Sequence, residues 1–286
     1  VLNTYGKGGM LGPNDAVALN LSSGQSLPLG TDWTYRVVSE DRPGGPQLPW
    51  ESVRGYTTIH NAMISPLTGF PLHAAIWYQG ESNADRGMAY QPLLERLVKS
   101  WRAYFGADLP VVIVQLPGYD GMPDRPGPSG WSDIREAQRR VAVNDPKTGL
   151  AVTIDAGDRT DIHPPNKQLV VQRILPVLAI LTGQGDGVED GIVPLRAVRD
   201  GGRISLEMPT GHLKTIGSAR PIAFEICGES GACEWADATL DGAMIDLGVP
   251  SQATPSEVRY CWGDAPICNL FSGDDVPVSP FRMGLE

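Results

Sequence analysis

The sequence has little positive charge and no long apolar run. Its 23 Lys and Arg residues face 33 Asp and Glu residues, which gives a formal net charge of −10 at pH 7. Nucleic-acid binding depends on a basic surface that neutralises phosphates, so we expect no nucleic-acid partner. The longest apolar run, ILPVLAIL at 174–181, is too short for a membrane span and contains Pro176. We therefore expect no membrane span, and the residues after Val1 show no signal peptide.

Cysteine is also scarce, and the common cofactor motifs are missing. The four cysteines, Cys227, Cys233, Cys261 and Cys268, do not have the spacing of a zinc motif. Their closeness suggests the pairs 227–233 and 261–268, but three connectivities are possible, and free thiols in a reducing cytosol fit equally well. The sequence has no H-E-x-x-H, and the G-K-G-G at 6–9 lacks the Ser or Thr of a phosphate loop. We expect no metal and no cofactor.

The central part of the sequence alternates between strand-like and helix-like patterns. Three apolar runs have the length of buried strands, and each precedes a helical pattern, the second with Ser132 as its expected N-cap. Strand–helix alternation predicts right-handed crossovers and a parallel sheet with helices on both faces, an α/β fold of three layers. After about residue 182 the sequence becomes β-rich. The expected strands are 73–78, 111–116 and 150–156, and the expected helices are 88–104, 134–143 and 167–181.

Two polar clusters follow strands of this expected sheet. QGESNA at 79–84 follows the first strand, and DRTDIHPPN at 158–166 follows the third. Ligands of open parallel sheets bind at the carboxyl ends of the strands. In the second cluster Asp161 and His163 form a candidate pair, in which the carboxylate orients an imidazole that acts as general base. The alternative is that Asp161 caps the next helix and His163 is an ordinary loop residue.

The first cluster has two possible catalytic uses. Residues 80–84, G-E-S-N-A, are similar to the G-x-S-x-G nucleophile elbow, which would make Ser82 a nucleophile, although a loop rather than a helix is expected to follow. The other use is stabilisation of an oxyanion by the Gln79 amide and the Gly80 N–H. A tight turn with a solvated amide is the interpretation without catalysis.

Several segments together resemble the sialate O-acetylesterase family, which are carbohydrate esterases of the SGNH type: IWYQGESNA, REAQ, TDIHPPNK and RYCWGDAPICNLF. The resemblance implies a serine esterase that removes O-acetyl groups from sugars without metal or organic cofactor, on a flavodoxin-like sheet. It implies a secreted, periplasmic or lysosomal location. By the same resemblance His163 is the base, Asp161 is its partner, and an oxyanion or substrate block contains Gln79, Gly80, Glu81 and Asn83.

The family's nucleophile block, G-Q-S-N-M, is missing. The only G-Q-S, at 24–26, is followed by L-P-L-G-T-D-W, so Ser26 is a less suitable candidate. We therefore expect the serine to lie outside this chain. If the serine is lost, the chain is a carbohydrate-binding or scaffold relative without catalysis.

The resemblance also divides the chain. Residues 1–45 correspond to the end of a β-rich inserted domain, 46–200 to an SGNH-like body incomplete at its N-terminus, and 201–286 to a β-rich segment. A sheet without its nucleophile strand has an unpaired edge. We therefore expect a complementing N-terminal segment or chain, or a homo-oligomer.

Overall fold

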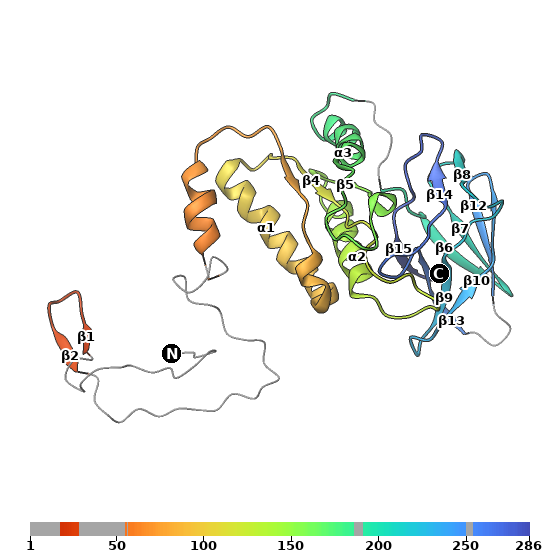
Figure 1. Ribbon diagram of the computed structural model, residues 1–286, viewed down its shortest axis with the longest axis horizontal. Coiled ribbons are helices and arrows are strands. Elements are labelled where there is room, and N and C mark those ends of the chain that lie inside the picture. The colour runs from red at the N-terminus through yellow and green to blue at the C-terminus, as the bar shows by residue number, and fades with distance from the viewer. Residues whose placement is uncertain (1–17, 29–54, 56, 186–190, 250–253) are drawn as a thin grey trace. The chain divides into compact units, whose positions relative to one another are not determined.

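The computed structural model describes residues 18–28, 55, 57–185, 191–249 and 254–286 (Figure 1). The chain divides into two compact units, 1–68 and 69–286. In the first unit, β1 (Ala18–Asn20) and β2 (Ser26–Pro28) form an antiparallel hairpin, and two short helices, η2 (His60–Ile64) and η3 (Ser65–Leu67), follow. Of the segment predicted to end an inserted domain, 1–45, only these hairpin residues are described, so its boundaries stay a prediction.

The second unit contains the predicted parallel sheet. Its strands are β3 (Ala75–Trp77), β4 (Val111–Val114) and β5 (Thr148–Ala151), in the order β3-β4-β5. Both ladders are parallel. All four residues of β4 are 0% exposed, as expected for a central strand covered on both faces. The predicted α/β class is confirmed.

Helices cover both faces of this sheet (Figure 1). The apolar side chains of β4 point alternately to the two faces, so each face needs a helix to cover it. Val111 and Ile113 pack with α1 (Tyr90–Phe105) and α2 (Gly130–Val143), and Val112 and Val114 pack with α3 (Lys167–Leu181). None of the described helices is long and apolar enough to cross a membrane.

The N-cap of α2 differs from the prediction. Ser129, not Ser132, caps the helix, and its side chain accepts a hydrogen bond from the Ser132 N–H at 3.0 Å. The Ser132 hydroxyl instead bonds the backbone of Gly263, which is far away in the sequence. The cap therefore lies three residues earlier than the sequence pattern indicated, at the end of a Gly- and Pro-rich loop.

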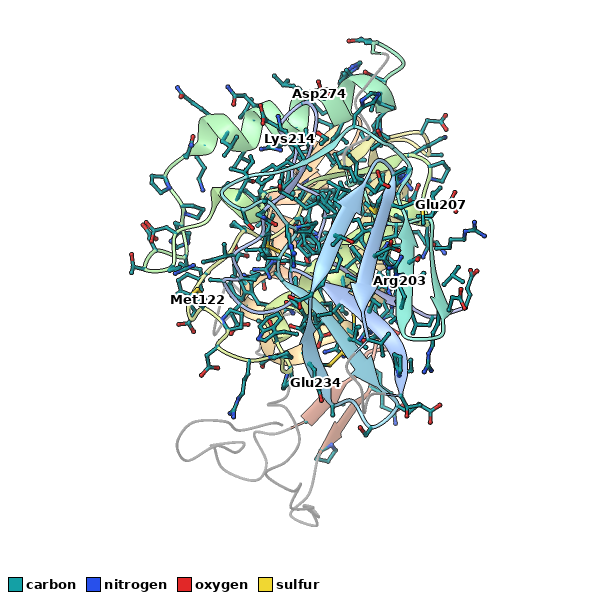
Figure 2. The ribbon with its side chains drawn as sticks, turned by 90° about the vertical axis from the view of Figure 1, so that its right-hand side faces the viewer. Met122, Arg203, Glu207, Lys214, Glu234 and Asp274 are labelled. Carbon is teal, nitrogen blue, oxygen red and sulfur yellow. A yellow bond between two sulfur atoms is a disulfide. The ribbon has the colours of Figure 1, made fainter. Side chains whose placement is uncertain are left out.

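The C-terminal part of the second unit consists of antiparallel strands (Figure 2). Two four-stranded sheets have the orders β11-β12-β7-β6 and β10-β9-β13-β15, and β14 pairs with β8. The strands are β6 (Arg196–Asp200), β7 (Arg203–Glu207), β8 (Leu213–Thr215), β9 (Phe224–Gly228), β10 (Cys233–Ala236), β11 (Ala238–Asp241), β12 (Met244–Gly248), β13 (Pro255–Tyr260), β14 (Leu270–Ser272) and β15 (Phe281–Gly284).

The four cysteines form two disulfides, with the suggested pairing. Cys227 and Cys233 are directly opposed on β9 and β10, and Cys261 and Cys268 close a loop after β13. The suggested connectivity is confirmed, and the alternative of free thiols is wrong. Each bridge closes a short local loop, which restricts the unfolded chain and so stabilises the fold.

Glu225 on β9 is a buried acid without a hydrogen-bond partner. Glu225 is 0% exposed, and neither of its carboxylate oxygens has a hydrogen-bond partner among the described residues. Burial raises the pKa of Glu225 to about 7; the Arg259 charge opposes this shift and the Glu257 charge adds to it. Since the folded protein holds this proton more tightly than the unfolded chain, the group lowers stability as the pH rises from about 4.5 to about 7.

Replacing Glu225 with glutamine should remove this pH dependence. From pH 5 to pH 8, the free energy of unfolding should fall about 2 to 3 kcal/mol further in the parent protein than in the variant. Urea unfolding at the two pH values measures the difference. Glu229→Gln, at an exposed position after the same strand, is the matched control and should behave as the parent. Equal pH dependence of Glu225→Gln and the parent would contradict the prediction.

Candidate active site

The residues that follow β3 are held by both helices of one sheet face. The Gln79 carbonyl oxygen accepts a hydrogen bond from the Tyr90 hydroxyl of α1 at 3.0 Å and another from Gln138 Nε2 of α2 at 3.1 Å. The Tyr90 hydroxyl in turn accepts a bond from the indole of Trp77 at 2.9 Å. The backbone at the end of β3 is therefore fixed from two directions.

Gly80 is buried in a position that only glycine can occupy. Its φ is 158°, and a Cβ built there would lie 2.7 Å from Ile134 Cγ2 and 3.1 Å from Leu116 Cδ1. The Gly80 N–H donates to the Glu81 carboxylate at 2.8 Å. Glu81 therefore occupies the N–H that the sequence suggested as an oxyanion donor, and a substrate oxygen can reach this donor only when the carboxylate turns away.

The side chain of Gln79 is oriented but not fully used. Its Nε2 lies 3.3 Å from Asn83 Oδ1 and its Oε1 lies 3.3 Å from the Tyr90 hydroxyl. An amide nitrogen carries two hydrogens, so a second donor remains for a ligand. Asn83 therefore contacts the Gln79 amide and restricts its orientation.

Neither candidate serine of this chain occupies a nucleophile elbow. Ser82 is exposed inside the 3-10 helix η4 (Glu81–Ala89), so the expected loop after the strand is wrong. Ser26 is the first residue of β2, paired with Asn20 in the first unit. Since an elbow places its serine in the tight turn from strand to helix, neither position has that geometry.

Asp161 and His163 lie side by side in the loop after β5. The imidazole Nδ1 is 3.9 Å from Asp161 Oδ1, within ion-pair range but too long for a hydrogen bond. The same carboxylate oxygen accepts a bond from the His163 backbone N–H at 2.8 Å. The cap of α3 is Asn166, whose side chain accepts from the Leu169 N–H, so the alternative of Asp161 as helix cap is wrong.

Both side chains of this pair are solvent-accessible, His163 at 85% and Asp161 at 57%. Among the described residues, Asp161 is the one carboxylate within ion-pair distance of the imidazole. The His163 ring is therefore free to meet another group.

A contact between Tyr78 and Lys167 connects the two clusters. The Lys167 ammonium lies 5.2 Å from the centre of the Tyr78 ring, the range of a cation–π interaction. Tyr78 precedes Gln79, and Lys167 begins α3, four residues after His163. The Tyr78 hydroxyl is buried without a partner among the described residues, and burial, with the Glu81 charge, raises its pKa to about 12. A residue that follows β3 and one that follows the β5 loop are thus in contact on the carboxyl side of the sheet, and the phenol at this contact is neutral.

Three residues of this arrangement are not among the sequence-predicted site residues: Tyr78, Tyr90 and Gln138. Gln138 belongs to REAQ, one of the segments that resemble the family, but the resemblance assigned no role to this segment. The other two are aromatic residues in or beside apolar runs, where a sequence pattern indicates core packing.

The described residues contain one group of potential metal ligands, Glu225 with Cys227 and Cys233, and its two sulfurs form a disulfide. At the carboxyl ends of the strands the groups on hand are amide and backbone donors, an imidazole and a carboxylate. Such groups bind and protonate oxygen atoms, as acyl transfer requires.

Residues 43–168 match the family described as carbohydrate esterase, sialic acid-specific acetylesterase. The sialate O-acetylesterases of Mus musculus and Homo sapiens are each 28% identical to the chain; the matches cover 86% and 82% of this chain but 49% and 50% of those proteins. A crystal structure of a carbohydrate acetylesterase from Xanthomonas citri is similar with a TM-score of 0.73 and 35% identity, covering 79% of this chain and 53% of that one. The chain spans about half the length of the curated relatives it matches.

The matched range contains both polar clusters, from Gln79 to His163. On this evidence the chain is similar to sialate O-acetylesterases in sequence and to a carbohydrate acetylesterase in sequence and structure.

Proposed function

We propose that the chain carries the general base and oxyanion donors of a serine esterase that hydrolyses O-acetyl esters of sugars. The observation that supports this most is that the Gln79–Gly80 donors and the Asp161–His163 pair follow the carboxyl ends of two strands of one parallel sheet, with their neighbours Tyr78 and Lys167 in contact. Relatives named as sialate O-acetylesterases and as a carbohydrate acetylesterase support the substrate class.

The proposed reaction uses these groups in two stages. His163 takes the proton of a serine hydroxyl, the serine oxygen attacks the acetyl carbonyl, and the Gln79 amide and Gly80 N–H stabilise the oxyanion. His163 then gives its proton to the departing sugar oxygen, and water hydrolyses the acetyl-enzyme by the same steps. Glu81 must release the Gly80 N–H before the oxyanion can bind, so Glu81 controls access to this donor.

We propose that the serine comes from outside this chain, on a segment that pairs with the free edge of β3. Among the described strands β3 pairs only with β4, and Ile76 in its middle is 52% exposed, whereas every residue of β4 is 0% exposed. An open strand edge with an apolar side chain favours the addition of another strand. A complementing N-terminal segment fits this edge, and a second copy of the chain is the alternative.

The proposal is tested with an aryl acetate and an O-acetylated sugar, on the chain alone and on the chain combined with a complementing N-terminal segment. We expect hydrolysis only in the combination, and labelling by a serine-directed phosphonate on the added segment. Labelling of Ser82 or Ser26, followed by loss of activity on its replacement with alanine, would overturn the external serine. The mass in solution separates the combination from a homo-oligomer.

The second candidate is a carbohydrate-binding relative without catalysis. It is favoured by one observation: among the described residues, no serine hydroxyl is paired with His163. If O-acetylated sugar binds while no preparation hydrolyses it or reacts with the phosphonate, this second candidate replaces the first.

The two disulfides favour an oxidising compartment, because such bonds rarely persist in the cytosol. We propose a secreted, periplasmic or lysosomal location. Retention of both bridges in protein isolated from its source under thiol-blocking conditions tests this.

A further inference from the structure

We propose that Gln138 on α2 is a positioning residue that aims the Gly80 N–H at the oxyanion. The inference rests on the proposed function, since it assigns Gln138 to the same site. Gln138 has no contact with a substrate in this assignment; it acts through the backbone between Gln79 and Gly80.

The geometry of one peptide group supports this assignment. The Gln79 carbonyl and the Gly80 N–H belong to the same planar peptide unit and point in opposite directions. The Gln138 amide donates to this carbonyl at 3.1 Å, and the Tyr90 hydroxyl donates to it at 3.0 Å. Any contact that fixes the direction of the Gln79 carbonyl also fixes the direction of the Gly80 N–H. The hydrogen bonds from Gln138 and Tyr90 to the carbonyl therefore determine where this N–H points.

Gln138 also connects this peptide to the neighbouring strand. Its Oε1 accepts a hydrogen bond from the Leu116 N–H at 2.9 Å, and its Nε2 lies 3.4 Å from the Val114 carbonyl. Leu116 and Gln79 lie just beyond the ends of β4 and β3, where the regular ladder has stopped. The fully buried amide of Gln138 thus bridges the ends of two strands.

The same helix face presses on Gly80 from the side. Ile134, four residues before Gln138 and therefore on the same face of α2, gives the 2.7 Å approach to a Cβ at Gly80. Leu116 gives the next closest approach, at 3.1 Å. Hydrogen bonding and packing from α2 therefore act together on the one peptide that carries the candidate oxyanion donor.

Two substitutions separate the two halves of this bridge. Gln138→Glu keeps the acceptor for the Leu116 N–H but loses the donor to the Gln79 carbonyl, and Gln138→Met loses both with little change in volume. Gln91→Met is the matched control, because Gln91 is a helix glutamine on α1 whose side chain, among the described residues, bonds Glu95 alone, at 2.8 Å on the surface. Circular dichroism establishes that each variant is folded before it is assayed.

In the form of the protein that hydrolyses acetyl esters, both Gln138 variants should lower kcat by about 10- to 100-fold, with KM within about twofold of the parent. Rates are divided by the concentration of folded enzyme, because a merely structural glutamine would lower only that concentration and leave kcat per folded molecule at the parental value. Gln91→Met should match the parent. A folded Gln138→Met or Gln138→Glu variant with parental kcat would overturn the inference.

Amide hydrogen exchange measured by NMR supplies a readout that needs no activity. Gln138→Met should speed exchange of the Leu116 N–H several-fold, whereas Gln138→Glu should leave it protected and change only the Gly80 N–H. The Gln115 N–H, bonded to the Ala151 carbonyl at 2.9 Å, is the internal reference and should not change.

The two readouts distinguish failure of the inference from failure of the proposed function. If the parent hydrolyses no ester but the exchange pattern appears, the proposed function fails and the bridge stands. If neither Leu116 nor Gly80 responds to the substitutions, the positioning role is overturned whatever the activity.

Discussion

Alanine in place of His163 should lower kcat for hydrolysis of an O-acetylated sugar by about 10²- to 10⁴-fold, the usual contribution of a general base. The serine hydroxyl would then have no group to accept its proton, and the departing sugar oxygen would have no donor. KM should change little, because the imidazole acts on the reacting atoms rather than on the rest of the sugar. Initial rates over a range of substrate concentrations measure both parameters.

This loss should occur without loss of the fold. The His163 side chain is 85% exposed, so its removal leaves no cavity. The unfolding midpoint of His163→Ala should therefore equal that of the parent. His212→Ala is the matched control: His212 is also exposed but lies in the C-terminal segment, and its replacement should leave kcat unchanged. A His163→Ala variant that retains parental kcat would remove His163 from the reaction.

The sheet could be predicted from the sequence because β4 is buried on both faces. A strand of this kind has no polar side, and the run V-V-I-V has no polar residue to suggest a surface helix. Helix ends were harder to predict. Ser132 has the right residue type for an N-cap, but its hydroxyl bonds Gly263, 131 residues away, and no local pattern contains that contact.

The candidate site divides in the same way between local and distant contacts. Gln79, Gly80, Asp161 and His163 were predicted because polar residues directly after buried strands are visible in the sequence. The hydrogen bonds that hold them were not predicted, since Gln138 lies on helix α2, 59 residues along the chain from Gln79. The hydrogen bond from the Gly80 N–H to the side chain of the next residue, Glu81, depends on backbone angles that residue types alone do not give.

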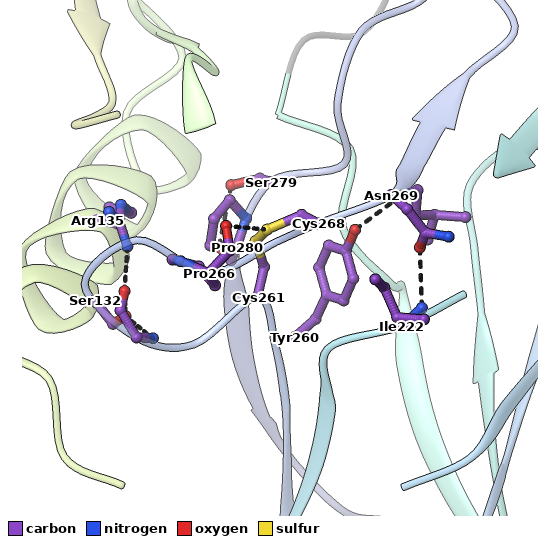
Figure 3. The surroundings of a disulfide bond; sticks show 12 residues. Ser132, Arg135, Ile222, Tyr260, Cys261, Pro266, Cys268, Asn269, Ser279 and Pro280 are labelled. Atoms are coloured by element: carbon purple, nitrogen blue, oxygen red, sulfur yellow. Dashed lines mark hydrogen bonds between the residues drawn. A yellow bond between two sulfur atoms is a disulfide. The ribbon is translucent and has the colours of Figure 1, made fainter. Parts of the chain in front are cut away.

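Arg135 carries the other prediction with a large expected effect. This arginine is fully buried, and its guanidinium donates to the carbonyls of Leu116 at 2.8 Å and Pro117 at 2.9 Å, just after β4. It also donates to the carbonyls of Gly263 at 2.7 Å and Asp264 at 2.6 Å, in the loop closed by the Cys261–Cys268 disulfide (Figure 3). A single side chain thus ties the α/β body to the C-terminal β-rich segment.

Arg135→Met should lower the free energy of unfolding by about 3 to 5 kcal/mol, because four hydrogen bonds from a charged donor are lost together. Arg135→Lys should be intermediate, since one ammonium cannot reproduce the planar fork that serves all four. Chemical denaturation measures both. Arg96→Met, at an exposed position of α1, is the control and should stay within about 0.5 kcal/mol of the parent.

The residues at which amide exchange rises in Arg135→Met show whether Arg135 connects the two parts of the protein or is an ordinary buried residue. Because the guanidinium bonds both sides of the contact, its loss should loosen the loop around Gly263 and the end of β4 together, and amide exchange should rise at both. If the variant loses less than about 1 kcal/mol, water or a neighbouring donor replaces the arginine. Other contacts, such as the hydrogen bonds between Ser132 and Gly263, would then hold the C-terminal segment, and its dependence on Arg135 would be refuted.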